Sequence, residues 1–192
     1  MIPSVSQCTE LMGRYEMLAN IKDHSFMVAR VTALLSRELQ RSGLAIDLDL
    51  ALAGALLHDI AKTQCLGGRC HHAEVGVEIC LAHGFAEVAE IVGEHVVLGD
   101  YAPENLSAKE VVYYADKRVN HDRIVSLGER LTYILERYGQ GDVQRGEMIM
   151  ENFEKCLLME ERIFSYLSFA PSQVPARVEA ADELAGEYAE SQ

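Results

Sequence analysis

The apolar positions of this chain recur with helical spacing along most of its length. In the segment 21–41, His24, Val28, Val31 and Leu35 follow at intervals of four, three and four, which places them on one helical face. No stretch in which apolar and polar residues alternate is longer than a few positions, so strands are not expected. The sequence therefore predicts an all-α helical bundle. The expected helices cover residues 7–18, 21–41, 50–62, 72–83, 85–97, 107–118, 126–138 and 142–169.

The segment 50–62 is apolar on nearly every side and ends in three polar residues, His58, Asp59 and Lys62. Its Ala and Leu residues favour a helix, and a helix that is apolar all round is buried. The three polar side chains therefore need partners inside the protein. A metal ion bound by His58 and Asp59 would satisfy two of them. Lys62 shares their helical face, where its ammonium could meet an anionic substrate.

Composition and charge narrow the function classes. The 192 residues suffice for one domain with a core, and 49% of them are hydrophobic. A net charge of −13 argues against binding to nucleic-acid polymers and to anionic membrane surfaces. We find no apolar run of membrane-spanning length and no signal-peptide pattern at the start, which predicts a cytoplasmic protein. Five cysteines form no disulfide framework, as expected in a reducing compartment.

Further histidines and carboxylates lie where they could complete a metal site. His24 is on an apolar helical face, either as a core histidine bonded to a neighbour or as a ligand. His72 opens a helix after a glycine-rich loop, with His71 as the alternative if the register differs by one. His95 lies beside apolar residues of its helix, and Asp116 follows an apolar and aromatic run. A buried Asp could pair with an arginine or bind metal.

These residues occur in an order that resembles the HD superfamily of metal-dependent phosphohydrolases. The stretch LLHDIAK resembles its His-Asp signature, HAEVG the His-x-x-x-Gly element of its two-metal branch, IVGEHV its fourth histidine position and YYADK its closing aspartate. In that element, Gly76 lets the backbone pack closely. The resemblance implies one HD domain over 7–169, with a metal-binding core at 20–125 and a helical cover at 126–169. We expect 170–192 to be a mobile acidic tail or a loosely docked helix. The implied metal ligands are His24, His58, Asp59, His72, His95 and Asp116.

The resemblance also implies the chemistry. Two divalent cations bridged by Asp59 would activate a water to hydrolyse a nucleotide or another small phosphoester, and mixed N and O ligands suit Fe, Mn or Zn. Asp59 and Lys62 are the expected catalytic residues. Lys62 would neutralise a phosphate oxygen, with Arg118 and Arg123 binding substrate at the rim. Asp100 and Tyr101 lie in a loop expected at the same rim, and the oligomeric state stays open.

Three other interpretations remain open at the level of sequence. Some HD-fold di-iron oxygenases use the same ligand types, and a non-catalytic, metal-bound nucleotide sensor would also keep them. A zinc site formed by Cys65, Cys70, His71 and His72 is a weaker possibility, because the cysteine spacing is loose. The Gly-Tyr-Pro signature of cyclic-di-nucleotide phosphodiesterases is absent from the sequence.

Overall fold

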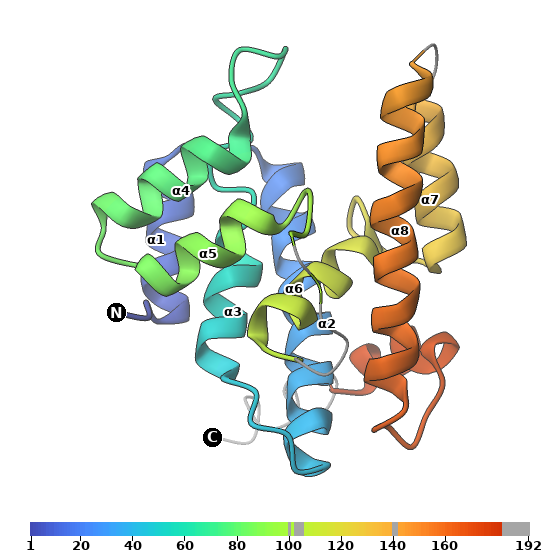
Figure 1. Ribbon diagram of the computed structural model, residues 1–192. Coiled ribbons are helices and arrows are strands. Elements are labelled where there is room, and N and C mark those ends of the chain that lie inside the picture. The colour runs from blue at the N-terminus through green and yellow to red at the C-terminus, as the bar shows by residue number, and fades with distance from the viewer. Residues whose placement is uncertain (100, 102–105, 140–141, 182–192) are drawn as a thin grey trace.

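The structure is a computed structural model that describes residues 1–99, 101, 106–139 and 142–181 (Figure 1). Its regular elements in these ranges are helices and one short antiparallel hairpin, which confirms the predicted all-α class. No helix in these ranges is both long enough and apolar enough to cross a bilayer. The elements are α1 (Val5–Arg14), α2 (Ala19–Arg41), α3 (Leu48–Leu57), α4 (His72–Ala82), α5 (Ala86–Glu94), α6 (Ala108–Lys117), β1 (Val119–Asn120), β2 (Arg123–Ile124), α7 (Leu127–Ile134), the π-helix η1 (Leu135–Gly139), α8 (Val143–Phe164) and the 3-10 helix η2 (Pro171–Gln173).

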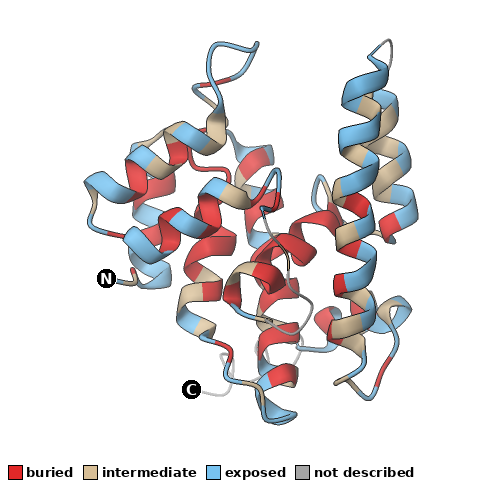
Figure 2. Cartoon of the chain, viewed as in Figure 1, coloured by how far each residue is buried: buried red, intermediate tan, exposed pale blue. Residues whose placement is uncertain are grey.

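Helix α3 lies in the middle of the bundle and packs against α1, α2, α5 and α6. Its residues 53–57 are all buried, as their unbroken apolar run predicts (Figure 2). The side chain of Asp47 caps the helix by accepting a hydrogen bond from the Leu50 amide at 3.0 Å. Helices α7 and α8 pack on each other, and α8 also contacts α6. The division into a metal-binding core at 20–125 and a helical cover at 126–169 remains a prediction.

Helix α3 is shorter than predicted, because it ends at Leu57 and not at Lys62. After His58 the chain continues in turns whose amides bond three residues back: Ile60 to Leu57 at 3.0 Å and Lys62 to Asp59 at 2.9 Å. This tighter winding replaces the four-residue bonds of an α-helix. As a result, the His-Asp pair lies in a turn at the end of the helix.

Two of the five cysteines are bonded to each other, which differs from the expectation that the cysteines form no disulfide framework. Cys65 and Cys70 form a disulfide with a Cα–Cα distance of 4.9 Å, while the other three cysteines are free and buried. Gly67 and Gly68 between them have positive φ angles of 78° and 74°, which lets this short loop close. The disulfide also removes the zinc interpretation, because sulfurs in a disulfide cannot act as thiolate ligands.

Where the structure describes it, the segment after Pro171 is docked as a helix. Residues 174–181 are helical, and Val174 and Val178 are 0% and 2% exposed within the core. The segment is rich in acidic residues, and its composition therefore did not indicate that these two valines are buried. Residues 182–192 lie outside the described part.

Cutting the chain after Pro171 should therefore destabilise the fold. Burial of two valines contributes about 3 kcal/mol, at roughly 1.5 kcal/mol or more for each side chain. Chemical denaturation of the truncated and full chains measures this difference. A cut after residue 181, which keeps both valines, serves as the control. A change below about 1 kcal/mol on cutting at Pro171, the range of surface changes, would mean that the segment is not held in the core.

Candidate metal centre

The structure brings all six candidate ligands together at the centre of the bundle. His24 comes from α2, His58 and Asp59 from the turn after α3, and His72 from the first position of α4. His95 is the residue directly after α5, and Asp116 lies in the last turn of α6. Five of the side chains are buried, while that of His72 is 26% exposed. The ligands therefore surround an interior site with His72 at its open edge.

The first ligand group contains His24, His58 and Asp59, whose ligand atoms all lie within 4.8 Å of one another. Asp116 completes this group, because its Oδ1 lies 3.0 Å from His24 Nε2 and 3.7 Å from His58 Nε2. Two imidazoles and two carboxylates form a mixed N and O set that suits a transition metal.

The second ligand group contains Asp59, His72 and His95, again within 4.8 Å. The Nε2 atoms of both histidines lie 3.4 Å from Asp59 Oδ1. The other carboxylate oxygen, Oδ2, lies 3.4 Å from His58 Nε2 in the first group. Asp59 thus presents one oxygen to each group, which is the arrangement expected of a bridging ligand.

The outer hydrogen bonds of the histidines fix which nitrogen faces the site. His24 Nδ1 donates to the His121 carbonyl at 2.8 Å, His58 Nδ1 to Ala55 at 2.8 Å and His95 Nδ1 to Val92 at 2.6 Å. A carbonyl can only accept, so each Nδ1 carries a proton, and in its neutral form each ring turns an Nε2 lone pair inward.

These inward lone pairs face carboxylate oxygens, which are also acceptors. His58 Nε2 and Asp59 Oδ1 are buried and make no hydrogen bond to any described residue. A buried acceptor without a donor is costly, and a cation between the acceptors would satisfy them together. The side chains present therefore suit divalent metal ions.

The pKa values of the ligands are set by burial and by the charges of their neighbours. Burial lowers the pKa of His58, but the Asp59 and Asp116 carboxylates outweigh it and raise this pKa above its usual value. Burial, followed by the repulsion that a protonated His95 would exert, lowers the pKa of His72 to about 4. Burial likewise lowers the pKa of His95. The carboxyl pKa values of Asp59 and Asp116 lie well below their usual range, because nearby cationic groups outweigh the effect of burial. At neutral pH the site thus presents ionised carboxylates and, in the second group, neutral imidazoles.

One functional contact was missed by the sequence analysis. The hairpin of β1 and β2 pairs Val119 with Ile124 and carries His121 at its turn with a φ of 55°. This left-handed conformation turns the His121 carbonyl toward His24 Nδ1. The available signal was the turn-favouring Asn-His-Asp stretch at 120–122, but it gave no indication of the contact with a distant helix.

Gly76 sets how closely α4 approaches α5, as the family element implies. A Cβ atom at this position would lie 2.6 Å from Val92 Cγ1, closer than any real contact. We therefore expect Gly76→Ala to lower the free energy of unfolding by about 1–3 kcal/mol through overpacking. Chemical denaturation tests this. Gly146→Ala is the matched control in an open helical position, where alanine should stabilise by up to about 1 kcal/mol. Equal stability changes in the two variants would contradict the close approach.

The proposed substrate-binding residues occupy different environments. The ammonium of Lys62 bonds Asp59 Oδ2 at 2.7 Å, and its side chain is 38% exposed at the edge of the site. Arg118 is only 2% exposed and donates to the carbonyls of Val125 and Pro171 and to Glu160. Its guanidinium is thus occupied within the protein, and its assignment to the substrate rim is wrong.

The other residues predicted at the substrate rim are Arg123, Asp100 and Tyr101, and the contacts of the site do not test their roles. Arg123 is exposed on β2, in the hairpin that contacts His24 through its turn, and it remains a predicted substrate-binding residue. Tyr101 is partly buried, and Asp100 lies outside the described residues.

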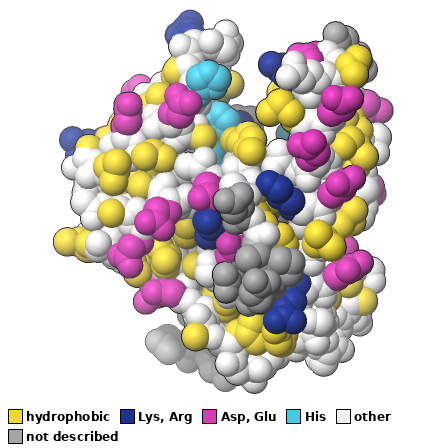
Figure 3. Space-filling model, viewed as in Figure 1, with side chains coloured by type: hydrophobic (Ala, Val, Ile, Leu, Met, Phe, Trp, Pro, Cys, Tyr) yellow, Lys and Arg dark blue, Asp and Glu magenta, His cyan; other side chains and the backbone are white. Residues whose placement is uncertain are grey.

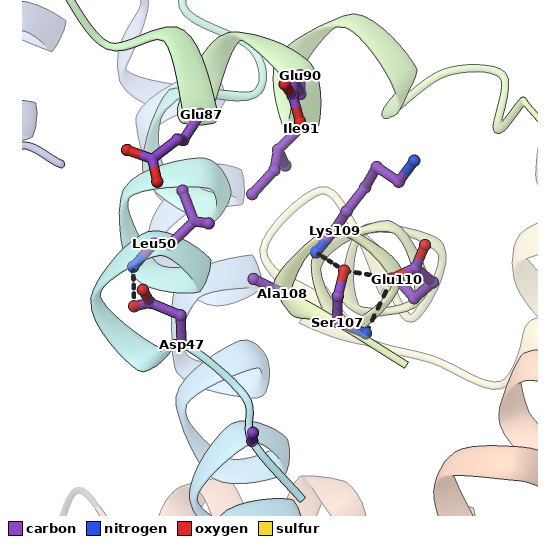
Figure 4. Close-up of a pocket in the computed structure, with 10 residues that line it drawn as sticks. Asp47, Leu50, Glu87, Glu90, Ile91, Ser107, Ala108, Lys109 and Glu110 are labelled. Carbon is purple, nitrogen blue, oxygen red and sulfur yellow. Dashed lines mark hydrogen bonds between the residues drawn. The ribbon is translucent and has the colours of Figure 1, made fainter. Parts of the chain in front are cut away.

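The accessible side of the centre lies toward His72 and Lys62. Histidine side chains reach the surface in the hollow between the part that contains α4 and the α7–α8 pair (Figure 3). A separate pocket between α3, α5 and the start of α6 contains none of the six ligands (Figure 4). Asp47, Glu87 and Glu90 line that pocket, and their carboxylates would repel a phosphate.

Comparison with known proteins identifies the family. The family model for the HD domain matches residues 21–127, more than half of the chain. The chain therefore belongs to the HD-domain family of metal-dependent phosphohydrolases. It is 26% identical over 150 residues to an uncharacterized protein of Methanocaldococcus jannaschii, a match that covers 70% of this chain and 87% of that protein.

Two other relatives match over smaller parts of their length. A tRNA (cytidine(56)-2'-O)-methyltransferase of Thermoplasma volcanium is 28% identical over 66% of this chain and 39% of its own. Ribonuclease Y of Pseudothermotoga lettingae is 33% identical over 45% of this chain and 16% of its own. No solved structure gives a significant match to the chain.

Proposed function

We propose that the protein is a two-metal phosphohydrolase or phosphodiesterase that hydrolyses a nucleotide or another small phosphoester. The observation that carries the proposal is the convergence of buried acceptors on Asp59, with one ligand group on each of its oxygens. When bound, two divalent cations supply a nucleophilic water at neutral pH and charge stabilisation for the phosphoryl group.

The chain's own residues divide the remaining tasks. His24, His58 and Asp116 would hold one ion, His72 and His95 would hold the other, and Asp59 would contribute to both sites. Their hydrogen bonds to main-chain carbonyls keep the imidazoles in the ligating tautomer before any ion arrives. Lys62 has an exposed ammonium beside the bridging carboxylate and meets a phosphate oxygen of the substrate.

Charge supports a small substrate over a nucleic-acid polymer. The net charge is −13, so the attraction for phosphate is confined to the ions and the few cationic side chains at the site. A polymer would need further Lys and Arg residues along its path. The relatives whose names refer to RNA share only a fraction of their length with this chain, so their substrates are not transferred.

A phosphoester panel on protein loaded with Mn²⁺, Fe²⁺ or Zn²⁺ tests the proposal. We expect hydrolysis of at least one nucleotide, phosphomonoester or phosphodiester, with loss of the activity on chelation and recovery on adding the metal back. Fully loaded protein that hydrolyses none of them would overturn the proposal. Dioxygen uptake by the iron-loaded form would then favour the alternative, an HD-fold di-iron oxygenase.

Lys62→Ala should separate substrate contact from metal binding. We expect the variant to keep its metal content and to lose about 10- to 100-fold in turnover, the equivalent of one charge-assisted contact of roughly 1.5–3 kcal/mol. Elemental analysis and steady-state kinetics measure the two effects. Lys109→Ala is the control, because Lys109 pairs with Glu94 at 3.1 Å and contacts no candidate ligand. Loss of metal in Lys62→Ala would instead assign Lys62 to the support of Asp59.

A further inference from the structure

Lys117 is a buried cation with no role in the sequence analysis. It is 6% exposed at the end of α6, and its ammonium lies 4.5 Å from the centre of the Tyr113 ring. Its Nζ atom donates to Asp116 Oδ2 at 2.7 Å and to the His95 carbonyl at 2.8 Å. An ammonium in the interior is costly unless it is paired in this way. The two polar partners are notable because both belong to candidate metal ligands.

The bond to Asp116 determines how that carboxylate faces the first ligand group. Oδ2 is held by Lys117, whereas Oδ1 lies 3.0 Å from His24 Nε2. With one oxygen fixed outward, the carboxylate cannot rotate to offer both oxygens to an ion.

The bond to His95 acts on the second ligand group through the main chain. His95 follows the last residue of α5, where carbonyl groups lack helical partners and a cation is favoured. The Lys117 ammonium satisfies the His95 carbonyl and thereby fixes the end of the helix from which the imidazole extends. The ring itself is held by its Nδ1 bond to Val92.

We propose that Lys117 is a positioning residue that joins the two halves of the metal centre by holding Asp116 in one and the backbone of His95 in the other. The inference rests on the proposed two-metal function. It also gives the two lysines of the site different roles. Lys62 is 38% exposed and can reach substrate, whereas Lys117 is enclosed and can act only on the ligands.

Lys117→Met tests the proposal, since it keeps an unbranched apolar chain as far as the Cε position and removes the ammonium. We expect metal affinity, measured by chelator competition, to fall by about 10- to 100-fold for each ion, as found when outer partners of metal ligands are removed. The d–d absorption spectrum of the Co²⁺-loaded protein should also change, because the direction of the Asp116 carboxylate changes. Activity is not needed for either readout.

Arg118→Met is the matched control. Arg118 is the next residue, is equally buried and pairs with Glu160, yet it contacts none of the six ligands. We expect this variant to lose stability while its metal affinity stays within about twofold and its Co²⁺ spectrum is unchanged. If Lys117→Met does not fold, Lys117→Gln, which keeps a donor without the charge, is judged by the same measurements.

Wild-type metal affinity and an unchanged Co²⁺ spectrum in a folded Lys117 variant would overturn the proposal. So would an equal loss of affinity in Arg118→Met, because a general structural effect would then explain both. A wild-type protein that binds no metal would be a different result, since it would contradict the proposed function itself.

Discussion

Asp59→Asn should remove both metal ions and almost all hydrolytic activity. The two oxygens of the carboxylate face the two ligand groups. Oδ1 lies 3.4 Å from the Nε2 atoms of His72 and His95, and Oδ2 lies 3.4 Å from His58 Nε2. An amide of the same size has no negative charge and turns a donor toward one of the two groups. Metal ions contribute several kcal/mol to such reactions, so hydrolysis should fall on the order of a thousandfold or more.

Elemental analysis and a phosphoester assay measure this result, and Glu94→Gln provides the matched control. Glu94 is also a helix-end carboxylate next to a ligand in the sequence, but it pairs with Lys109 and the Gly99 amide. This control should keep its full metal content. If Asp59→Asn kept two ions, the shared role of the carboxylate would be wrong.

His72→Ala and His95→Ala should each remove one ion and leave the other. His24, His58, Asp59 and Asp116 still form a site in both variants. Loss of the second cation removes several kcal/mol of charge stabilisation, so hydrolysis should fall on the order of a hundredfold or more. Stability should differ between the variants, because the His72 side chain is 26% exposed and that of His95 only 3%. We therefore expect the lower melting temperature in His95→Ala.

His83→Ala is the control for this pair. His83 caps the other end of α4 and bonds the Tyr15 hydroxyl at 3.1 Å, away from the ligands. It should keep both metal ions and full activity. Full metal content and activity in both His72→Ala and His95→Ala would reduce the protein to a one-metal enzyme and remove the basis for the two-metal proposals.

Much of the fold could be predicted from the sequence because its signals are local. Apolar spacing placed most of the helices, and the capping boxes at Ser107 and Ser126 fix the starts of α6 and α7. The six candidate ligands could be selected because they are polar residues in largely apolar surroundings and occur in the order that resembles the HD superfamily. Their exclusion from water then follows from the apolar helices that carry them.

The remaining features depend on contacts between distant segments. The turn at His121 and the ammonium of Lys117 act on ligands 97 and 22 residues away, respectively, and no local pattern indicates either contact. Arg118 was placed at the substrate rim because a basic residue after the Asp116 motif could equally face outward. The end of α3 at Leu57 was missed for a similar reason, since the turns that follow it carry helix-favouring residues.

The most direct test of the account is the metal content of the wild-type protein, purified without added metal and then loaded under anaerobic conditions. We predict about two ions per chain, both removable by a chelator, because the two ligand groups share Asp59 and are otherwise complete. One ion per chain at saturation would contradict the two-metal centre, and none would contradict metal-dependent chemistry at this site.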